Sequence, residues 1–173
     1  MRKLALLAAL FAAGCPGLGQ VAFDISSSGQ STVQGSPLGG VLPAPPGFEG
    51  FTGSSFSQSQ QFQNNNTNKD HISSCRVGKL TLKVVSPSGA TLSFLSKIEF
   101  FIKTDALPEV RIAEALAVPA GATSIELSLD DQQIAPYARS DSFSITTKAA
   151  GTQPSQNTTI EADLTLHIEA NVL

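Results

Sequence analysis

The feature that most constrains the fold is an alternation of apolar and polar residues that recurs from Val21 to the end of the chain. A period of two is typical of a β-strand with one face in a core, because successive side chains point to opposite sides. In the clearest run, every second residue from Ile160 to Val172 is apolar, and most residues between them are polar. Turn signals rich in Pro, Gly and Ser separate the runs. The sequence therefore predicts an all-β, antiparallel sandwich of about seven to eight strands.

The same pattern predicts where the strands and the few helical turns lie. The segment 110–113 is assigned to a strand because Pro108 and Pro119 leave little length for a helix. One or two short helical turns are expected, at 68–74 and 131–137. The expected strands are 21–25, 80–84, 98–102, 110–113, 125–129, 143–147 and 160–172.

The segment 34–66 differs from the rest because Gly, Pro, Ser, Gln and Asn dominate it. Such low complexity is typical of a flexible connection. It nevertheless contains Phe48, Phe51, Phe56 and Phe62, whereas disordered spacers are poor in aromatic residues. We expect these four side chains to pack on the sandwich. The alternative is an exposed adhesive stretch that contacts a partner protein or the membrane.

The first fourteen residues have the layout of an export signal. Arg2 and Lys3 are followed by ten apolar residues that end in small side chains. A helix that spans a bilayer needs roughly 20 apolar residues, and Gly14 and Pro16 end this run at about half that length. We therefore expect residues 1–14 to be a signal peptide that is removed on export.

The junction Ala12-Ala13-Gly14-Cys15 resembles the lipobox of bacterial lipoproteins, in which small residues precede a cysteine that is diacylated and begins the mature chain. The resemblance covers the first fifteen residues, and Ala12 stands where leucine is commonest. It implies that Cys15 is lipidated and that residues 15–20 form a tether. The alternative is cleavage by the ordinary signal peptidase after Ala13 or Gly14, which releases a secreted chain without lipid.

Cys75 is the second of the two cysteines. If Cys15 carries the lipid, Cys75 is a lone thiol, and such thiols in exported proteins are more often buried than catalytic. No histidine stands at a spacing that marks it as a partner, so Cys75 is expected to be structural. Without acylation, Cys15 and Cys75 could instead form a disulfide.

The body as a whole, residues 21–173, resembles in general plan the immunoglobulin-like sandwich lipoproteins common in bacterial envelopes. Its early strand, the run "KLTLKVVSPSGATLSFLSKIEFFI" and the run "LPEVRIA" carry the resemblance. The resemblance implies a single immunoglobulin-like β-sandwich domain that contains the 34–66 segment. It also implies a location in the cell envelope, lipid-anchored to the outer membrane. It supplies no site residues.

The composition of the chain argues against two classes of partner. Removal of residues 1–14 leaves nine basic and fourteen acidic residues, a formal charge of −5. No basic residue stands between Lys3 and Lys69, whereas a nucleic-acid binder needs clustered Lys and Arg. We therefore expect no nucleic-acid partner. Carbohydrate binding is disfavoured, because the chain has no Trp and a single Tyr to offer as a stacking platform.

No motif in the sequence predicts catalysis, a metal site or a cofactor. His71 lies in an Asn-rich turn and is expected to be solvated, and His167 is expected to make a cross-strand hydrogen bond. Asp130 and Asp131 are expected to cap a helix, because the alternating ligands and central glycine of a calcium loop are missing. The Gly-x-Ser-x-Gly, His-Glu-x-x-His, Ser-x-x-Lys and P-loop patterns do not occur.

These observations lead to one functional hypothesis and two alternatives. The hypothesis is a lipid-anchored envelope lipoprotein that acts as a non-enzymatic structural or interaction module, bound to the membrane through its lipid and to an envelope protein. The first alternative is a carrier that holds an apolar ligand such as a lipid between its sheets. The second is an esterase or glycosidase whose site is assembled from residues far apart in the sequence.

Overall fold

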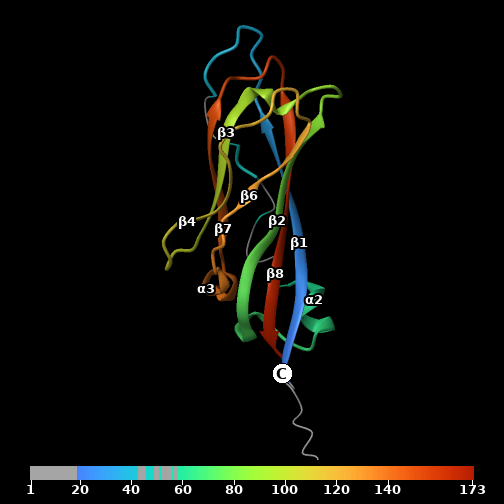
Figure 1. Ribbon diagram of the computed structural model, residues 1–173, viewed down its shortest axis with the longest axis vertical. Coiled ribbons are helices and arrows are strands. Elements are labelled where there is room, and N and C mark those ends of the chain that lie inside the picture. The colour runs from blue at the N-terminus through green and yellow to red at the C-terminus, as the bar shows by residue number, and fades with distance from the viewer. Residues whose placement is uncertain (1–18, 43–45, 49–50, 52–55, 57) are drawn as a thin grey trace, which may run out of the picture.

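The computed structural model describes residues 19–42, 46–48, 51, 56 and 58–173, and in them two four-stranded antiparallel sheets face each other (Figure 1). The first sheet has the order β1-β8-β2-β5 and the second the order β6-β4-β3-β7. The predicted all-β antiparallel sandwich is confirmed. The strands are β1 (Gln20–Val33), β2 (Ile72–Ser86), β3 (Leu95–Lys103), β4 (Val110–Ala115), β5 (Ser124–Glu126), β6 (Ser128–Leu129), β7 (Ser144–Gly151) and β8 (Thr158–Asn171).

Helical structure in the described residues is short. It comprises α2 (Gln60–Asn64), α3 (Ala135–Arg139) and the single 3-10 turns η1 (Lys69–His71) and η2 (Leu92–Phe94). The turn expected at 68–74 is confined to η1, because Ile72 already pairs with Ala170 in the sheet and is 2% exposed. None of the helices in the described ranges is long and apolar enough to cross a membrane.

Three long strands set the elongated shape of the molecule. β1 and β8 pair without a register shift from Gln20 opposite Asn171 to Val33 opposite Thr158. β2 pairs with the other side of β8, so β8 lies at the centre of the first sheet. The start of β1 and the C-terminus lie together at one end of the long axis, and the loop that follows β1 lies at the other (Figure 1).

Alternation in β8 produces one wall of the core. Its residues from Thr158 to Ala170 alternate between buried and more exposed positions, as the period of two predicts. On β2 the alternation shifts by one residue between Val77 and Leu80, which are both buried. A bulge explains the shift, because Gly78 is the extra residue between Val77 opposite Leu166 and Lys79 opposite Thr165.

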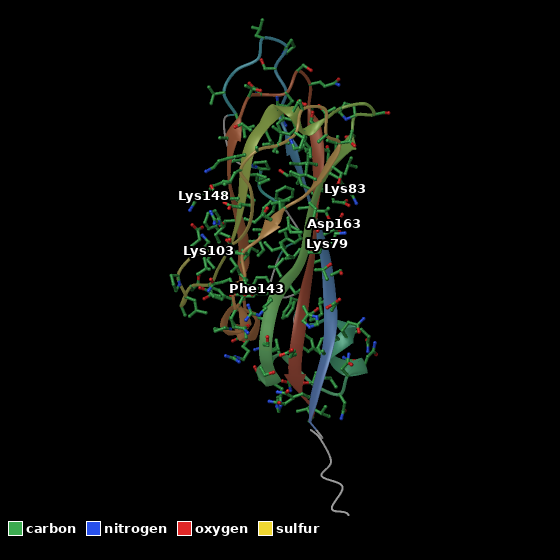
Figure 2. The ribbon with its side chains drawn as sticks, viewed as in Figure 1. Lys79, Lys83, Lys103, Phe143, Lys148 and Asp163 are labelled. Carbon is green, nitrogen blue, oxygen red and sulfur yellow. The ribbon has the colours of Figure 1, made fainter. Side chains whose placement is uncertain are left out.

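The outer faces of both sheets carry charge. Figure 2 shows Lys79, Lys83 and Asp163 on the first sheet and Lys103 and Lys148 on the second, all pointing away from the core. Lys83 Nζ lies 2.9 Å from a carboxylate oxygen of Asp163. These charges are solvated or paired on the surface, which leaves the space between the sheets apolar.

The first and last strands, β1 and β8, lie side by side, and the connections β2–β3, β4–β5, β5–β6 and β7–β8 cross between the sheets. Periodicity along the chain does not record this order of strands. In this arrangement two described residues of the 34–66 segment, Val41 and Pro46, lie beside β7 and the residue that follows it. Val41 forms an isolated bridge with Thr152, and Thr147 Oγ1 donates a hydrogen bond to the Pro46 carbonyl.

Candidate functional site

The four phenylalanines of the 34–66 segment are buried in the core. Phe48 is 8% exposed, Phe51 5%, Phe56 6% and Phe62 3%. Burying a phenylalanine stabilises a fold by about 1.5–3 kcal/mol, so this segment contributes substantially to the core. The expected packing is therefore found. The exposed adhesive stretch does not describe these side chains, because they have almost no surface to offer a partner.

The rings of Phe56 and Phe62 belong to a row of aromatic contacts that reaches from one sheet to the other. Phe62 lies edge-on to Phe23 of β1, with centroids 5.5 Å apart, and edge-on to Phe56 at 5.6 Å. Phe56 in turn packs edge-on against Phe143, just before β7, at 5.6 Å. Edge-to-face pairs at this spacing are favourable beyond the area that they bury. Phe56 and Phe62 thereby link β1 of the first sheet to the residue just before β7 of the second.

Helix α2 holds the end of this segment in place. Ser59 is its N-cap, and the Ser59 hydroxyl accepts a hydrogen bond from the Gln61 N–H. The Thr67 N–H donates to the carbonyl of Phe62. The Thr67 hydroxyl donates to the carbonyl of Asn171 at the end of β8. A local cap and one long-range hydrogen bond thus fix Phe62 beside β1.

A partly open apolar cavity of about 130 Å³ lies beside this aromatic wall. It is roughly the size of a cavity that holds a benzene molecule. Its lining combines the inner face of β1 and β8 with the phenylalanines. The lining residues are Ile25, Ser26, Ser27, Phe51, Phe56, Ser59, Phe143, Leu164 and Leu166. Figure 2 shows Phe143 between the two sheets.

The sequence of β1 explains why space remains there. Ile25, Ser27, Gly29 and Ser31 share the inner face of the strand, opposite Leu166, Leu164, Ala162 and Ile160 of β8. Ile25 fills its place in the core, whereas Ser27 and Gly29 carry little or no side chain. The large side chains of Leu164 and Leu166 therefore have no bulky neighbour on β1 beyond Ile25. The cavity follows from small residues at inward positions.

A second, larger hollow lies between the loop before η2 and the loop before β8. It has a volume of about 420 Å³ and includes Thr91, Ser93, Gln153 and Gln156 among its lining residues. No titratable side chain lines it. This hollow is a surface groove of hydroxyls and amides, and its lining contains no acidic or basic side chain that could activate one of the hydroxyls.

Cys75 is a free thiol in β2 that is completely buried. Burial raises its pKa from 9.0 to about 12, because the thiolate would lose its hydration. A buried, protonated thiol is neither a ready nucleophile nor a metal ligand. Cys75 is therefore a core residue, as expected.

The two histidines lie apart from each other and from the cavity. His167 Nδ1 lies 2.8 Å from Asp24 Oδ1 across the β1–β8 pair, the expected cross-strand hydrogen bond. His71 ends the turn η1, and the carboxylate of its neighbour Asp70 pairs with Lys69 Nζ at 3.1 Å. Neither arrangement places a histidine beside a nucleophile.

The expectation that Asp130 and Asp131 cap a helix is wrong. The N-cap of α3 is Ile134, which makes no side-chain capping bond. Asp130 instead accepts a hydrogen bond from Arg111 Nε at 2.8 Å, and Asp131 pairs with Arg76. Arginine partners are more favourable for these carboxylates than a short helix end. Within the described ranges, no three His, Cys, Asp or Glu residues gather where they could hold a metal ion.

Sequence reasoning located the aromatic residues but not the cavity that they help to form. The signal that could have indicated the cavity is the run Ser26-Ser27-Ser28-Gly29, which puts small residues at inward positions of an otherwise apolar alternation. Cys15, the predicted lipidation site, lies outside the described residues, as does the predicted signal peptide 1–14.

Comparisons with known proteins add little to this description. No protein-family model and no curated protein match the chain. Among solved structures, the chain is similar to one in the "Crystal structure of decameric BFDV Capsid Protein", with a TM-score of 0.37 and 12% identity. That match covers 87% of this chain and 98% of the other. A likeness at this level carries no argument about function.

Proposed function

We propose that the protein is an exported, lipid-anchored module of the cell envelope that works by binding other proteins rather than by catalysis. The observation that carries the proposal is the position of β1. This strand begins at Gln20, five residues after Cys15, at one end of the long axis (Figure 1). The Val172 N–H donates to the Gly19 carbonyl at 2.7 Å, so the strand start is held against the C-terminal end of β8.

A lipid on Cys15 would therefore attach at one end of an elongated body. The 14 residues of β1 span roughly 45 Å at about 3.3 Å per residue, so the opposite end would stand well away from the outer membrane. The side of the sandwich would also remain accessible from the periplasm or the surface. This geometry favours a module that presents surfaces to an envelope protein.

The absence of catalysis stays part of the proposal, and it is supported by how the described charged groups are used. Arg111 pairs with both Glu99 and Asp130, and Lys148 pairs with Glu109. Hydrogen bonds to Lys97 and Arg111 lower the pKa of Glu99, so this carboxylate is unsuited to act as a general acid near neutral pH. Such pairs stabilise the outer face of a sheet.

The carrier alternative is favoured by the apolar cavity but limited by its size. Pockets that hold a ligand of ordinary size measure about 300–1,000 Å³. The cavity beside Phe51 and Phe56 measures about 130 Å³, which suits a single apolar side chain and is too small for a lipid chain. A lipid chain would fit this cavity only if Phe51 and Phe56 moved.

Membrane fractionation tests the proposal. The wild-type chain and the Cys15→Ser variant are expressed with a radiolabelled or alkyne-tagged fatty acid, and the membrane pellet and the soluble fraction are compared. The wild type is expected to be labelled and to pellet, and the variant to be unlabelled and soluble. A wild type that is never labelled, or a variant that still pellets, would overturn the anchor. A ligand of lipid mass retained in native mass spectrometry would favour the carrier.

A further inference from the structure

We propose that the protein binds a second copy of itself, end to end, through the end of the sandwich that lies opposite the C-terminus (Figure 1). The inference goes beyond the proposed function, because it names a surface and a partner that the lipid anchor does not require. Four segments between or after strands meet at this end, and we call them together the uncharged end. They are 34–40, 87–94, 116–123 and 152–157.

Backbone hydrogen bonds join the four segments of the uncharged end into one continuous surface. All of their residues are among those that the structure describes. The bonds run, donor first, from Ser36 to Pro154 at 2.8 Å, from Thr152 to Phe94 at 2.7 Å and from Leu92 to Ala122 at 2.7 Å. The surface is therefore built in the single chain and does not need a partner to form.

The first observation is the distribution of charge along the molecule. None of the four segments contains Asp, Glu, Lys, Arg or His. The connections 104–109 and 130–143 and the turn η1 all contain charged residues. The formal charge of −5 that remains without residues 1–14 is thus carried entirely by the rest of the molecule. Two copies of one acidic protein repel each other, and they meet with the least repulsion at an uncharged surface.

The second observation is that the chemistry of this end is self-complementary. The groove of about 420 Å³ lies between two of the four segments, and Ser93, Gln153 and Gln156 are among the residues that line it. Hydroxyl and amide groups both donate and accept hydrogen bonds, so the same groups can pair with each other across a two-fold axis. A charged partner would lose hydration at this end without gaining an opposite charge. The uncharged end therefore fits another copy of itself.

The third observation is an exposed leucine in a fixed turn. Leu38 is 97% exposed. The Gly39 N–H donates to the Ser36 carbonyl at 3.0 Å, and the Gln153 N–H donates to the Gly40 carbonyl at 2.8 Å. The backbone on both sides of Leu38 is thus held in place before association, so burial of this side chain needs little further ordering of the chain. Leu38 is the apolar anchor that we assign to the contact.

An end-to-end pair has a shape that distinguishes it from other dimers. The start of β1 lies at the end of the long axis opposite the uncharged end (Figure 1). A pair joined through the uncharged ends therefore has the two β1 starts at its extremes and is about twice as long as one copy. A pair joined through the charged faces of the sheets would keep about the length of one copy.

Analytical ultracentrifugation and small-angle X-ray scattering of the exported chain carrying Cys15→Ser test the inference. This change removes both the lipid and a cysteine that could join copies covalently. A dimer is expected to form as the concentration rises to on the order of 1 mM, where weak contacts become populated. Its maximum dimension is expected to be about twice that of the monomer. Added NaCl is expected to strengthen the dimer, because salt screens the repulsion between the acidic bodies.

Three variants locate the contact. Leu38→Asp removes the apolar anchor and puts a charge opposite its own copy, and it is expected to weaken the dimer by about tenfold or more. Gln156→Glu adds a carboxylate in the groove with little change in size and is expected to weaken the dimer as well. The matched control is Leu173→Asp, because Leu173 is 67% exposed and lies at the C-terminus. This control adds the same charge at the opposite end and is expected to leave the dimer unchanged.

Four results would overturn the inference. They are a chain that stays monomeric over the whole concentration range, a dimer about as long as one copy, a dimer that salt weakens, and a dimer that survives both Leu38→Asp and Gln156→Glu. Because the sample carries no lipid, failure of self-association here and failure of the anchor in membrane fractionation are distinguishable.

Discussion

The ring of Phe48 packs 5.4 Å from the ring of Phe100, centroid to centroid, and Phe100 is completely buried in β3. This contact joins a segment of low sequence complexity to the centre of the second sheet. The segment is therefore part of the architecture, although its composition is that of a linker.

Replacing Phe48 with alanine tests that contact. A buried phenylalanine truncated to alanine costs about 3–5 kcal/mol, through lost burial and the cavity left behind. We expect Phe48→Ala to lower the free energy of unfolding by about that amount in urea denaturation. The control is Leu38→Ala, because Leu38 is 97% exposed and its truncation should change stability by less than about 0.5 kcal/mol. Equal midpoints for both variants would contradict the packing.

The burial of Cys75 predicts that the protein loses stability at alkaline pH. The pKa of the Cys75 thiol is about 12 in the folded protein and 9.0 for an exposed thiol. The thiol therefore stays protonated to a higher pH in the folded state than in the unfolded state. The contribution is fully present below pH 9.0 and is lost progressively as the pH rises toward 12, because the unfolded state is favoured by ionisation. The free energy of unfolding, measured by urea titration at several pH values, is expected to fall more steeply for the wild type than for Cys75→Ala.

The same residue predicts slow chemical labelling. A buried thiol with a raised pKa is almost entirely protonated at pH 8, and only the thiolate reacts with iodoacetamide. Labelling of Cys75 is expected to be negligible in the native protein and rapid in urea. Prompt labelling without urea, or a disulfide between Cys15 and Cys75 in a tryptic digest, would contradict this prediction.

The close packing around Gly151, at the end of β7, predicts that this position accepts only glycine. A Cβ added there would lie 2.0 Å from the backbone oxygen of Phe94, which cannot move without disturbing the strand. We expect Gly151→Ala to destabilise the protein by about 1–3 kcal/mol, the usual cost of overpacking. The control is Gly78→Ala, where the nearest atom would lie 3.6 Å away. Thermal melts of the two variants should differ clearly, and matching melts would contradict the close approach.

Much of the fold could be predicted because the alternation records burial directly. The residues from Ile160 to Ala170 predict β8 from spacing alone, since a strand with one buried face tolerates few polar inward residues. The bulge at Gly78 could not be predicted, because a one-residue shift in alternation looks the same as a break between strands. The start of β2 at Ile72 was missed for a similar reason: its partner Ala170 lies at the far end of the chain.

The candidate site could be predicted only in part. Four phenylalanines in a polar segment indicated packing, because their exposure would forgo a large part of a small domain's stability. The cavity depends on how Phe51 and Phe56 meet Ser27, which is more than twenty residues away in sequence. The position of β1 at the end of its sheet, among the described strands, depends on the order of strands in that sheet. The alternation of apolar and polar residues along the chain indicates neither the cavity nor the place of β1 in its sheet.

The central claim, a lipid-anchored module, is tested most directly by mass spectrometry of the mature protein isolated from membranes. The account predicts a chain that begins at Cys15 and whose N-terminal peptide carries the added mass of the acyl groups. A chain that begins at Gly14, or one that begins at Cys15 without added mass, would contradict it and identify a secreted protein without an anchor.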